Sequence, residues 1–149
     1  MSENKRLAIV TGGVGGIGTA ICERLAKDGI TVVATYHPSE EDKLVDWSKA
    51  RAEAGVEVGL TACDVSSPED SARMVADVEK EFGPVDIIVN CAGITRDKTM
   101  KRMDAESWDA VINTNLNSAF YVTKPAWEGM LNRGFGRIIN ISSVNGQHG

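Results

Sequence analysis

Cysteine is scarce in this sequence, and no long apolar run occurs in it. The 149 residues include three cysteines, which are far apart, odd in number and outside any C-x-x-C pattern: Cys22, Cys63 and Cys91. Such spacing favours reduced thiols in a cytoplasmic protein over a disulfide framework or a metal site. No stretch approaches the roughly 18 consecutive apolar residues of a membrane helix. The apolar run at residues 7–10, after a charged start, is too short for a signal peptide, so we expect no membrane partner. The spacing of the cysteines leads us to expect no metal.

Net positive charge is also lacking. Lysine and arginine number 16 against 21 aspartates and glutamates, which gives a formal net charge of −5. This balance argues against a nucleic-acid-binding protein, because such proteins usually carry a basic surface. Apolar residues make up 42% of the chain and charged residues 25%, as in an average globular protein. A chain of this size buries about two thirds of its unfolded surface, so it needs no disulfides.

Short apolar runs alternate with helical stretches along the whole chain. The runs predict strands at residues 7–10, 31–36, 56–63, 85–89 and 137–141. The stretches between them predict helices at 16–27, 40–54 and 68–82, and a long helix from about residue 104 to 131 with a kink at Pro125. This alternation indicates a parallel sheet covered by helices on both faces. The expected fold is α/β, a doubly wound parallel sheet of the Rossmann type, in one domain over residues 1–149.

A glycine-rich turn lies between the first strand and the first helix. Residues 11–18 read T-G-G-V-G-G-I-G. Spacing alone leaves two registers open, namely G-x-G-x-x-G at Gly13, Gly15 and Gly18 and T-G-x-x-x-G-x-G at Gly12, Gly16 and Gly18. Without a Cβ the backbone can turn sharply and approach a pyrophosphate, whose charge meets the helix N-terminus. The context of strand, turn and helix predicts a dinucleotide site; a tight turn without a ligand is the alternative.

The end of the second strand bears on the choice of dinucleotide. A carboxylate there would bind the ribose 2′-hydroxyl of NAD, but the strand ends Thr35-Tyr36-His37. The absence of an acid removes repulsion against a 2′-phosphate. Neither the strand end nor the glycine turn has an arginine or lysine, and Thr35, Tyr36, His37 and Ser39 offer only neutral or weakly cationic contacts. We therefore expect NADPH as the cofactor, with NADH as the alternative.

Three further motifs follow in order along the chain. Asn90-Cys91-Ala92-Gly93 comes after the fourth strand, Asn115 lies within the long helix, and Asn140-Ile141-Ser142-Ser143-Val144 ends the fifth strand. Together with the T-G-x-x-x-G-x-G turn, they resemble the short-chain dehydrogenases/reductases over essentially the whole chain. The resemblance selects the register of Gly12, Gly16 and Gly18 for the glycine turn.

The resemblance implies a role for each matching residue. Asp64 and Val65 would border the adenine. Ser143 would be the catalytic serine that hydrogen-bonds the substrate carbonyl, and Asn115 the catalytic-site asparagine that anchors a water in a proton relay. Cys91 departs from the family's usual second asparagine, a modest change that leaves the turn intact. The implied cofactor-binding residues are Thr11, Gly12, Gly16, Ile17, Gly18, Tyr36, Asp64, Val65, Asn90, Ala92 and Gly93.

Within this family, residues 93–97, 108–111, 134–137 and 142–147 resemble acetoacetyl-CoA reductases. That resemblance implies an oxidoreductase that converts acetoacetyl-CoA to (R)-3-hydroxybutyryl-CoA for polyhydroxybutyrate synthesis, and a homotetramer as the full-length enzyme. The alternative is a 3-oxoacyl-acyl-carrier-protein reductase. Asn145 and Gln147 are the implied substrate-binding residues, because the Asn145-Gly146-Gln147 segment looks more like the CoA enzymes.

A cluster of cations after the fourth strand supports a substrate that carries phosphates. Arg96, Lys98, Lys101 and Arg102 lie close together at the sheet edge where such folds bind ligands. Cations there would attract the phosphates of CoA or an acidic carrier protein, with Arg96 as the main candidate for substrate binding. A solvated charged loop is the alternative interpretation.

The resemblance also implies two residues that this chain does not contain. The family has a tyrosine about thirteen positions after the catalytic serine, as the general acid, and a lysine four positions later. Both positions fall beyond Gly149. We therefore expect the chain to hold the first five strands of a larger domain, inactive alone, with an exposed fifth strand and exposed Phe120 and Trp127. A non-catalytic dinucleotide-binding module, complete at 149 residues, is the competing hypothesis.

Overall fold

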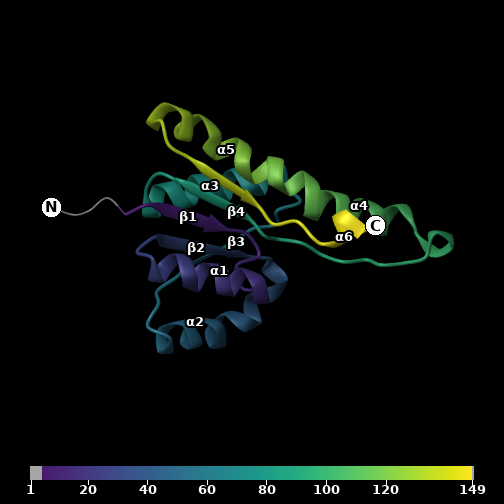
Figure 1. Cartoon of the computed structure of the whole chain (residues 1–149), viewed down its shortest axis with the longest axis horizontal. Coiled ribbons are helices and arrows are strands. Elements are labelled where there is room, and N and C mark those ends of the chain that lie inside the picture. Colours follow the sequence, from purple (N-terminus) through teal and green to yellow (C-terminus); the bar gives the residue numbers. More distant parts are fainter. Residues whose placement is uncertain (1–4, 149) are drawn as a thin grey trace.

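The apolar segments of the sequence pair into one parallel sheet in the computed structural model, which describes residues 5–148 (Figure 1). The strands are β1 (Leu7–Val10), β2 (Thr31–Tyr36), β3 (Gly59–Ala62), β4 (Ile87–Asn90) and β5 (Arg137–Asn140). Their order in the sheet is β3-β2-β1-β4-β5, and every neighbouring pair is parallel. The chain winds outward from β1 in both directions, which confirms the predicted doubly wound fold.

Helices cover both faces of this sheet. They are α1 (Gly16–Lys27), α2 (Leu44–Glu53), α3 (Pro68–Phe82), α4 (Ala105–Val111), α5 (Ser118–Arg133) and α6 (Asn145–His148). In Figure 1, α1 and α2 lie on one side of the strands, and α3 and α5 lie on the other. The described residues also include the short helical segments η1 (Pro38–Lys43), η2 (Met100–Arg102) and η3 (Ile112–Asn117).

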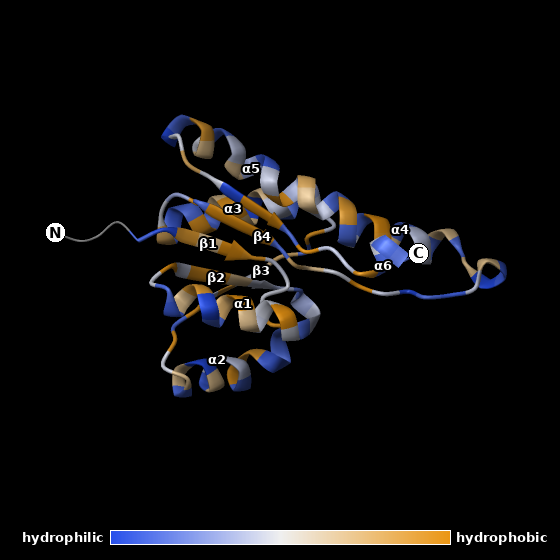
Figure 2. Ribbon diagram, viewed as in Figure 1, coloured by the Kyte–Doolittle hydropathy of each residue, from blue (hydrophilic) through white to orange (hydrophobic). Residues whose placement is uncertain are grey.

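The alternation of side chains along β1 divides the core into two layers. Ile9 packs with Met74 of α3 and Val122 of α5. Its neighbours Ala8 and Val10 face the opposite way and pack with Cys22 of α1. Because both faces of the sheet are covered, every residue of β1 and of β4 is buried, and these strands are apolar except for Asn90 at the end of β4 (Figure 2).

Several boundaries differ from the predictions, and local contacts explain two of them. The second helix begins at Leu44 and not at Glu40, because His37 and Pro38 start the separate 3-10 segment η1. The third strand begins at Gly59 and not at Val56, whose N–H donates to the Arg51 carbonyl at the end of α2. The fourth strand spans 87–90 where we predict 85–89, and the fifth ends at residue 140.

The long helix predicted from residue 104 is divided into three parts. The segments α4 and α5 are joined by η3, a π-helical stretch in which each turn holds an extra residue. Polar side chains bond back along the helix here: Asn117 Nδ2 donates to Asn113 Oδ1 at 2.8 Å, and Ser118 Oγ donates to the Thr114 carbonyl at 2.5 Å. Pro125 lies inside α5, which is continuous through it. Single π-helical turns are frequent at functional sites, and Asn115 lies within η3, so this segment is a candidate part of the site.

Large apolar side chains are exposed along α5 and on β5, as expected. Phe120 is 64% exposed, Trp127 48% and Ile139 46%. The strand β5 forms one edge of the sheet. Within residues 5–148, no helix has the length and apolar character needed to cross a membrane.

We predict that Ile88→Ala, in the centre of β4, lowers the free energy of unfolding by about 2–5 kcal/mol, because Ile88 is fully buried and its truncation leaves a cavity. Urea denaturation measures the change. Val45→Ala is the matched control: Val45 is 78% exposed on α2, so the change should stay within about 0.5 kcal/mol. Equal effects of the two substitutions would contradict the position of β4 inside the sheet.

Candidate functional site

The carboxyl ends of β1 and β4 form the centre of the candidate site. These strands are adjacent, and the chain leaves them in opposite directions around the sheet. A doubly wound sheet binds its ligands in the crevice at such a point. The glycine turn follows β1, and residues 91–104 follow β4 (Figure 1).

Packing explains why three residues of the turn must be glycine. Gly12 has a φ of +60°, and a Cβ there would lie 2.9 Å from Ala92 Cα. A Cβ on Gly13 would lie 2.5 Å from Ala34 Cβ of β2, and one on Gly18 would collide with the Gly12 carbonyl oxygen. By contrast, no atom lies within 4 Å of a Cβ built on Gly16, which faces open space. The structure thus shows that Gly13, which is not part of the chosen register, must also be glycine. In the sequence, its place in the other possible register was the signal for this requirement.

The N-terminus of α1 is open to an anion. Its first residues have no side-chain cap, since the capping position is Gly15, and the first turn contains no acidic residue. The unpaired N–H groups of a first helical turn carry partial positive charge and bind phosphate readily. The adjacent Ile17 side chain is 64% exposed. The turn therefore has the space and the charge for a pyrophosphate.

Thr11 joins this turn to the segment after β4. Its buried hydroxyl oxygen accepts hydrogen bonds from the N–H groups of Cys91 and Ala92, each at 3.1 Å. Because the bond to residue 91 comes from the main chain, a cysteine there preserves the turn. Burial raises the pKa of the Cys91 thiol, so the side chain stays neutral at physiological pH.

Asn90 faces the interior of the protein. Its Nδ2 donates to Asn140 Oδ1 at 2.9 Å and lies 3.3 Å from Thr123 Oγ1, which links β4 to β5 and to α5. Its Oδ1 is buried and has no hydrogen-bond partner among the described residues. The side chain thus connects three elements, and its predicted contact with a cofactor stays a prediction.

Asn115, in the π-helical stretch η3, holds the loop after β4 by two hydrogen bonds. Its Oδ1 accepts from the Ile94 N–H at 2.8 Å, and its Nδ2 donates to the Ile94 carbonyl at 2.9 Å. Gly93 lies beside it, because a Cβ at that position would come within 3.5 Å of Asn115 Oδ1. The amide group is therefore occupied in fixing the loop. The predicted role of Asn115 in a proton relay stays a prediction.

Ser143 follows β5, at the end of the sheet where the carboxyl ends of β1 and β4 also lie. The Ile141 N–H donates to the Asn90 carbonyl at 3.0 Å, which extends the pairing of β5 with β4 toward the site. Ser143 Oγ accepts a hydrogen bond from the Asn145 N–H at 3.2 Å, so its own proton remains available to another acceptor. The side chains of Ser143, Asn145 and Gln147 are all exposed on this segment.

Asp64 and Val65 follow β3, and Tyr36 ends β2 beside them. The Cys63 N–H donates to the Tyr36 carbonyl at 2.9 Å, which continues the pairing of these strands. Val65 is buried. Asp64 Oδ1 accepts hydrogen bonds from the N–H and the hydroxyl of Ser66, at 3.0 and 2.6 Å. These residues thus lie together at the carboxyl ends of β2 and β3, and their predicted contacts with the adenine stay predictions.

The cationic residues after β4 fall into two groups. Lys98 Nζ donates to Asp104 Oδ2 at 2.6 Å and to Ser107 Oγ at 2.8 Å. The bond from Lys98, followed by the one from the Ser107 N–H, lowers the pKa of Asp104 to about 2. Arg96 is exposed and bonds only to the adjacent Thr95 carbonyl, at 2.7 Å. Among residues 5–148, the cations without an ion pair in this loop are Arg96, Lys101 and Arg102.

Metal-binding side chains do not gather in the part of the chain that the structure describes. No group of three or more histidine, cysteine, aspartate or glutamate side chains is placed there to hold an ion. Cys22 and Cys63 are buried thiols, and burial raises their pKa values to about 12 and about 11.

Comparisons with known proteins cover nearly the whole chain. A model of the short chain dehydrogenase family matches residues 6–149. An acetoacetyl-CoA reductase of Allochromatium vinosum is 63% identical over 144 residues, which are 97% of this chain and 58% of that protein. Nodulation protein G of Azospirillum brasilense is 50% identical over 146 residues, 98% of this chain and 59% of that protein.

A solved structure agrees with the fold. A crystal structure of a variant actinorhodin polyketide ketoreductase with NADPH superposes with a TM-score of 0.91 at 39% sequence identity. The match covers 100% of this chain and 57% of that one. The chain therefore spans somewhat more than half the length of the relatives it matches.

We predict that Gly18→Ala weakens dinucleotide binding at least about tenfold and costs about 1–3 kcal/mol of stability, because the new methyl group forces the Gly12 carbonyl to move. Calorimetric titration and thermal unfolding measure the two effects. The matched variant Gly16→Ala meets no atom, so its stability should be unchanged. Loss of binding in Gly16→Ala without loss of stability would place the ligand directly against residue 16. The packing argument is wrong if Gly18→Ala is as stable as the wild type.

Proposed function

Because this chain belongs to the short-chain dehydrogenase family, we propose that it supplies the nucleotide-binding residues and the catalytic serine of an NADPH-dependent reductase of 3-oxoacyl thioesters. The proposed substrate is acetoacetyl-CoA and the product (R)-3-hydroxybutyryl-CoA, as the name of the 63% identical relative suggests. The observation that carries the proposal is that Ser143 follows the carboxyl end of β5, at the same end of the sheet as the glycine turn that follows β1.

The residues present fit a dinucleotide. The open N-terminus of α1 suits the pyrophosphate, and Gly16, where a Cβ would face open space, leaves room for it. Ser66 occupies one oxygen of Asp64, so the other is available to the amino group of an adenine. The end of β2 presents Tyr36 and His37 without a carboxylate at the strand end, which favours NADPH over NADH. A relative solved with NADPH supports the same choice.

The chemistry assigned to this chain is polarisation of the keto group. When bound, NADPH would supply a hydride to the 3-keto carbon of the substrate. Negative charge then develops on the keto oxygen, and a hydrogen-bond donor placed there lowers the barrier. Ser143 suits this task because its Oγ accepts from the Asn145 N–H and keeps its proton for the substrate. We assign protonation of that oxygen to the tyrosine that the family resemblance expects after Ser143.

Arg96 is proposed to contact the phosphates of the CoA group. It extends from the loop after β4, and no carboxylate pairs with it among residues 5–148. Asn145 and Gln147 lie on the exposed segment beyond Ser143, where an acyl thioester would pass to reach the serine. A carrier protein presents the same acyl group on a phosphopantetheine arm, so the acyl group alone does not distinguish CoA from a carrier protein.

We propose that the enzyme is cytoplasmic and assembles from several subunits. Cys22, Cys63 and Cys91 are free thiols, which favours the cytoplasm. The exposed apolar side chains of α5 suit burial between subunits, and we propose a homotetramer for the full-length enzyme.

We predict that Ser143→Ala in the full-length protein lowers kcat for acetoacetyl-CoA by about 10²- to 10³-fold, because the donor to the developing charge is lost. NADPH oxidation at 340 nm, in steady state, measures the rate. The affinity for NADPH should not change. The neighbouring Ser142→Ala is the matched control and should retain its activity. Equal losses in the two variants would remove Ser143 from the catalytic role.

We predict that Arg96→Ala raises KM for acetoacetyl-CoA about three- to tenfold at low ionic strength and leaves kcat unchanged, because a phosphate contact is lost. Acetoacetyl-pantetheine, which lacks the phosphates, serves as the control substrate, and its KM should not respond to the substitution. A parallel rise of both KM values would contradict the phosphate contact. A drop in activity only with the acyl carrier protein would assign Arg96 to the carrier.

A further inference from the structure

The main chain at the carboxyl end of β3 is bound by two side chains of α3. This strand is at the edge of the sheet and pairs only with β2. The Cys63 N–H points toward β2, where it donates to the Tyr36 carbonyl. Because main-chain groups alternate in direction along a strand, the Ala62 carbonyl and the Asp64 N–H point the opposite way, toward the open edge.

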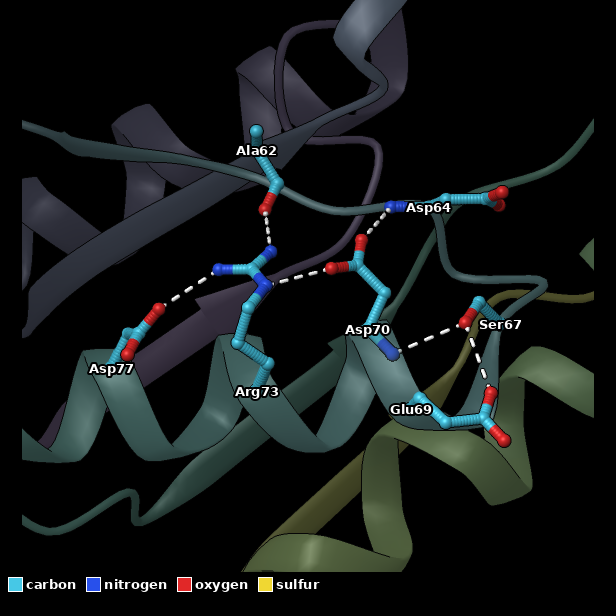
Figure 3. A network of polar contacts seen from close by, with 7 residues as sticks. All are labelled: Ala62, Asp64, Ser67, Glu69, Asp70, Arg73 and Asp77. Atoms are coloured by element: carbon cyan, nitrogen blue, oxygen red, sulfur yellow. Dashed lines mark hydrogen bonds and ion pairs between the residues drawn. The ribbon is translucent and has the colours of Figure 1, made fainter.

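Two side chains of α3 bind these edge groups (Figure 3). Arg73 donates through an Nη to the Ala62 carbonyl at 2.9 Å. Asp70 accepts through Oδ2 from the Asp64 N–H at 2.7 Å. A residue of a neighbouring parallel strand, opposite Cys63, would make the same two bonds: one donated to residue 62 and one accepted from residue 64. The pair thus replaces a missing strand where β3 ends.

The pair is held together from both sides. Arg73 Nε donates to Asp70 Oδ1 at 2.7 Å, and its remaining Nη donates to Asp77 at 2.8 Å. The backbone N–H of Asp70 is capped by Ser67 Oγ at 3.1 Å, at the start of α3. The bond from Arg73, with a smaller contribution from the Asp64 N–H, lowers the pKa of Asp70, so the carboxylate stays charged throughout the physiological range.

We propose that Asp70 and Arg73 are positioning residues for the adenine end of the site, because they fix the main chain of Asp64. Figure 3 shows the Asp64 carboxylate directed away from Asp70, so the contact passes through the main chain and leaves that carboxylate to the ligand. This inference rests on the proposed dinucleotide function.

We predict that Asp70→Asn in the full-length protein raises Kd for NADPH about three- to tenfold, because the charged acceptor of the Asp64 N–H is lost. Isothermal titration measures Kd, and kcat at saturating NADPH should stay the same, since Ser143 is not affected. Arg73→Lys, which keeps the charge but cannot bond Ala62 and Asp70 in the same geometry, should weaken binding in the same direction.

Asp77→Asn is the matched control. It removes the other carboxylate bound to Arg73 but touches neither residue 62 nor residue 64, so Kd should change less than in Asp70→Asn. A double-mutant cycle with Asp64→Ala separates positioning from general stability. If Asp70 acts through Asp64, Asp70→Asn adds nothing to the effect of Asp64→Ala.

Each other outcome is decisive. A wild-type protein that does not bind NADPH overturns the proposed function. Tight binding by the wild type with an unchanged Kd in Asp70→Asn and Arg73→Lys overturns only the positioning role. Additive losses in the cycle also overturn it, because Asp70 would then act independently of Asp64.

Discussion

The buried hydroxyl of Thr11 connects the two chain segments on which the candidate site depends. By accepting from the N–H groups of Cys91 and Ala92, it sets the distance between the turn after β1 and the turn after β4. Gly12 packs against Ala92 at that same junction, so neither turn can move alone. Since the crevice of a doubly wound sheet lies between these turns, the Thr11 bonds and the Gly12 packing together help to set its width.

The same use of polar side chains recurs around the site. Asn115 bonds the main chain of Ile94, and Asp70 bonds the main chain of Asp64. In each case a side chain of a type that often acts in catalysis is used to hold an irregular segment that has no strand or helix partner. Main-chain groups of an irregular segment lack the partners that a strand or helix supplies, and these side chains provide them. The groups left for chemistry are then few, and Ser143 Oγ is the clearest among them.

The sequence predicted the elements whose ends carry strong local signals. Helix α3 begins after Ser67, whose hydroxyl caps it, and ends at Gly83, whose φ is +107°. Helix α1 lies between Gly15 and the Asp28-Gly29 turn in the same way. Features that depend on distant contacts could not be predicted. The need for Gly13 arises from Ala34 on another strand, and the bond from Asn115 to Ile94 spans 21 residues.

The end of β2 shows how local capping and ligand preference use the same residues. The His37 N–H donates to Glu40 Oε1 at 3.0 Å, and its ring Nδ1 accepts from the Ser39 N–H at 3.1 Å. The Glu40 carboxylate is thereby turned back onto the main chain, and Lys43 lies 3.9 Å from its other oxygen. Its negative charge is thus partly balanced within η1 and is less able to repel a 2′-phosphate. His37 Nδ1 accepts from the Ser39 N–H and lies 2.7 Å from Ser39 Oγ, so among the described residues Nε2 is the ring nitrogen left to contact a phosphate oxygen. A preference for NADPH therefore does not require an arginine at this strand end.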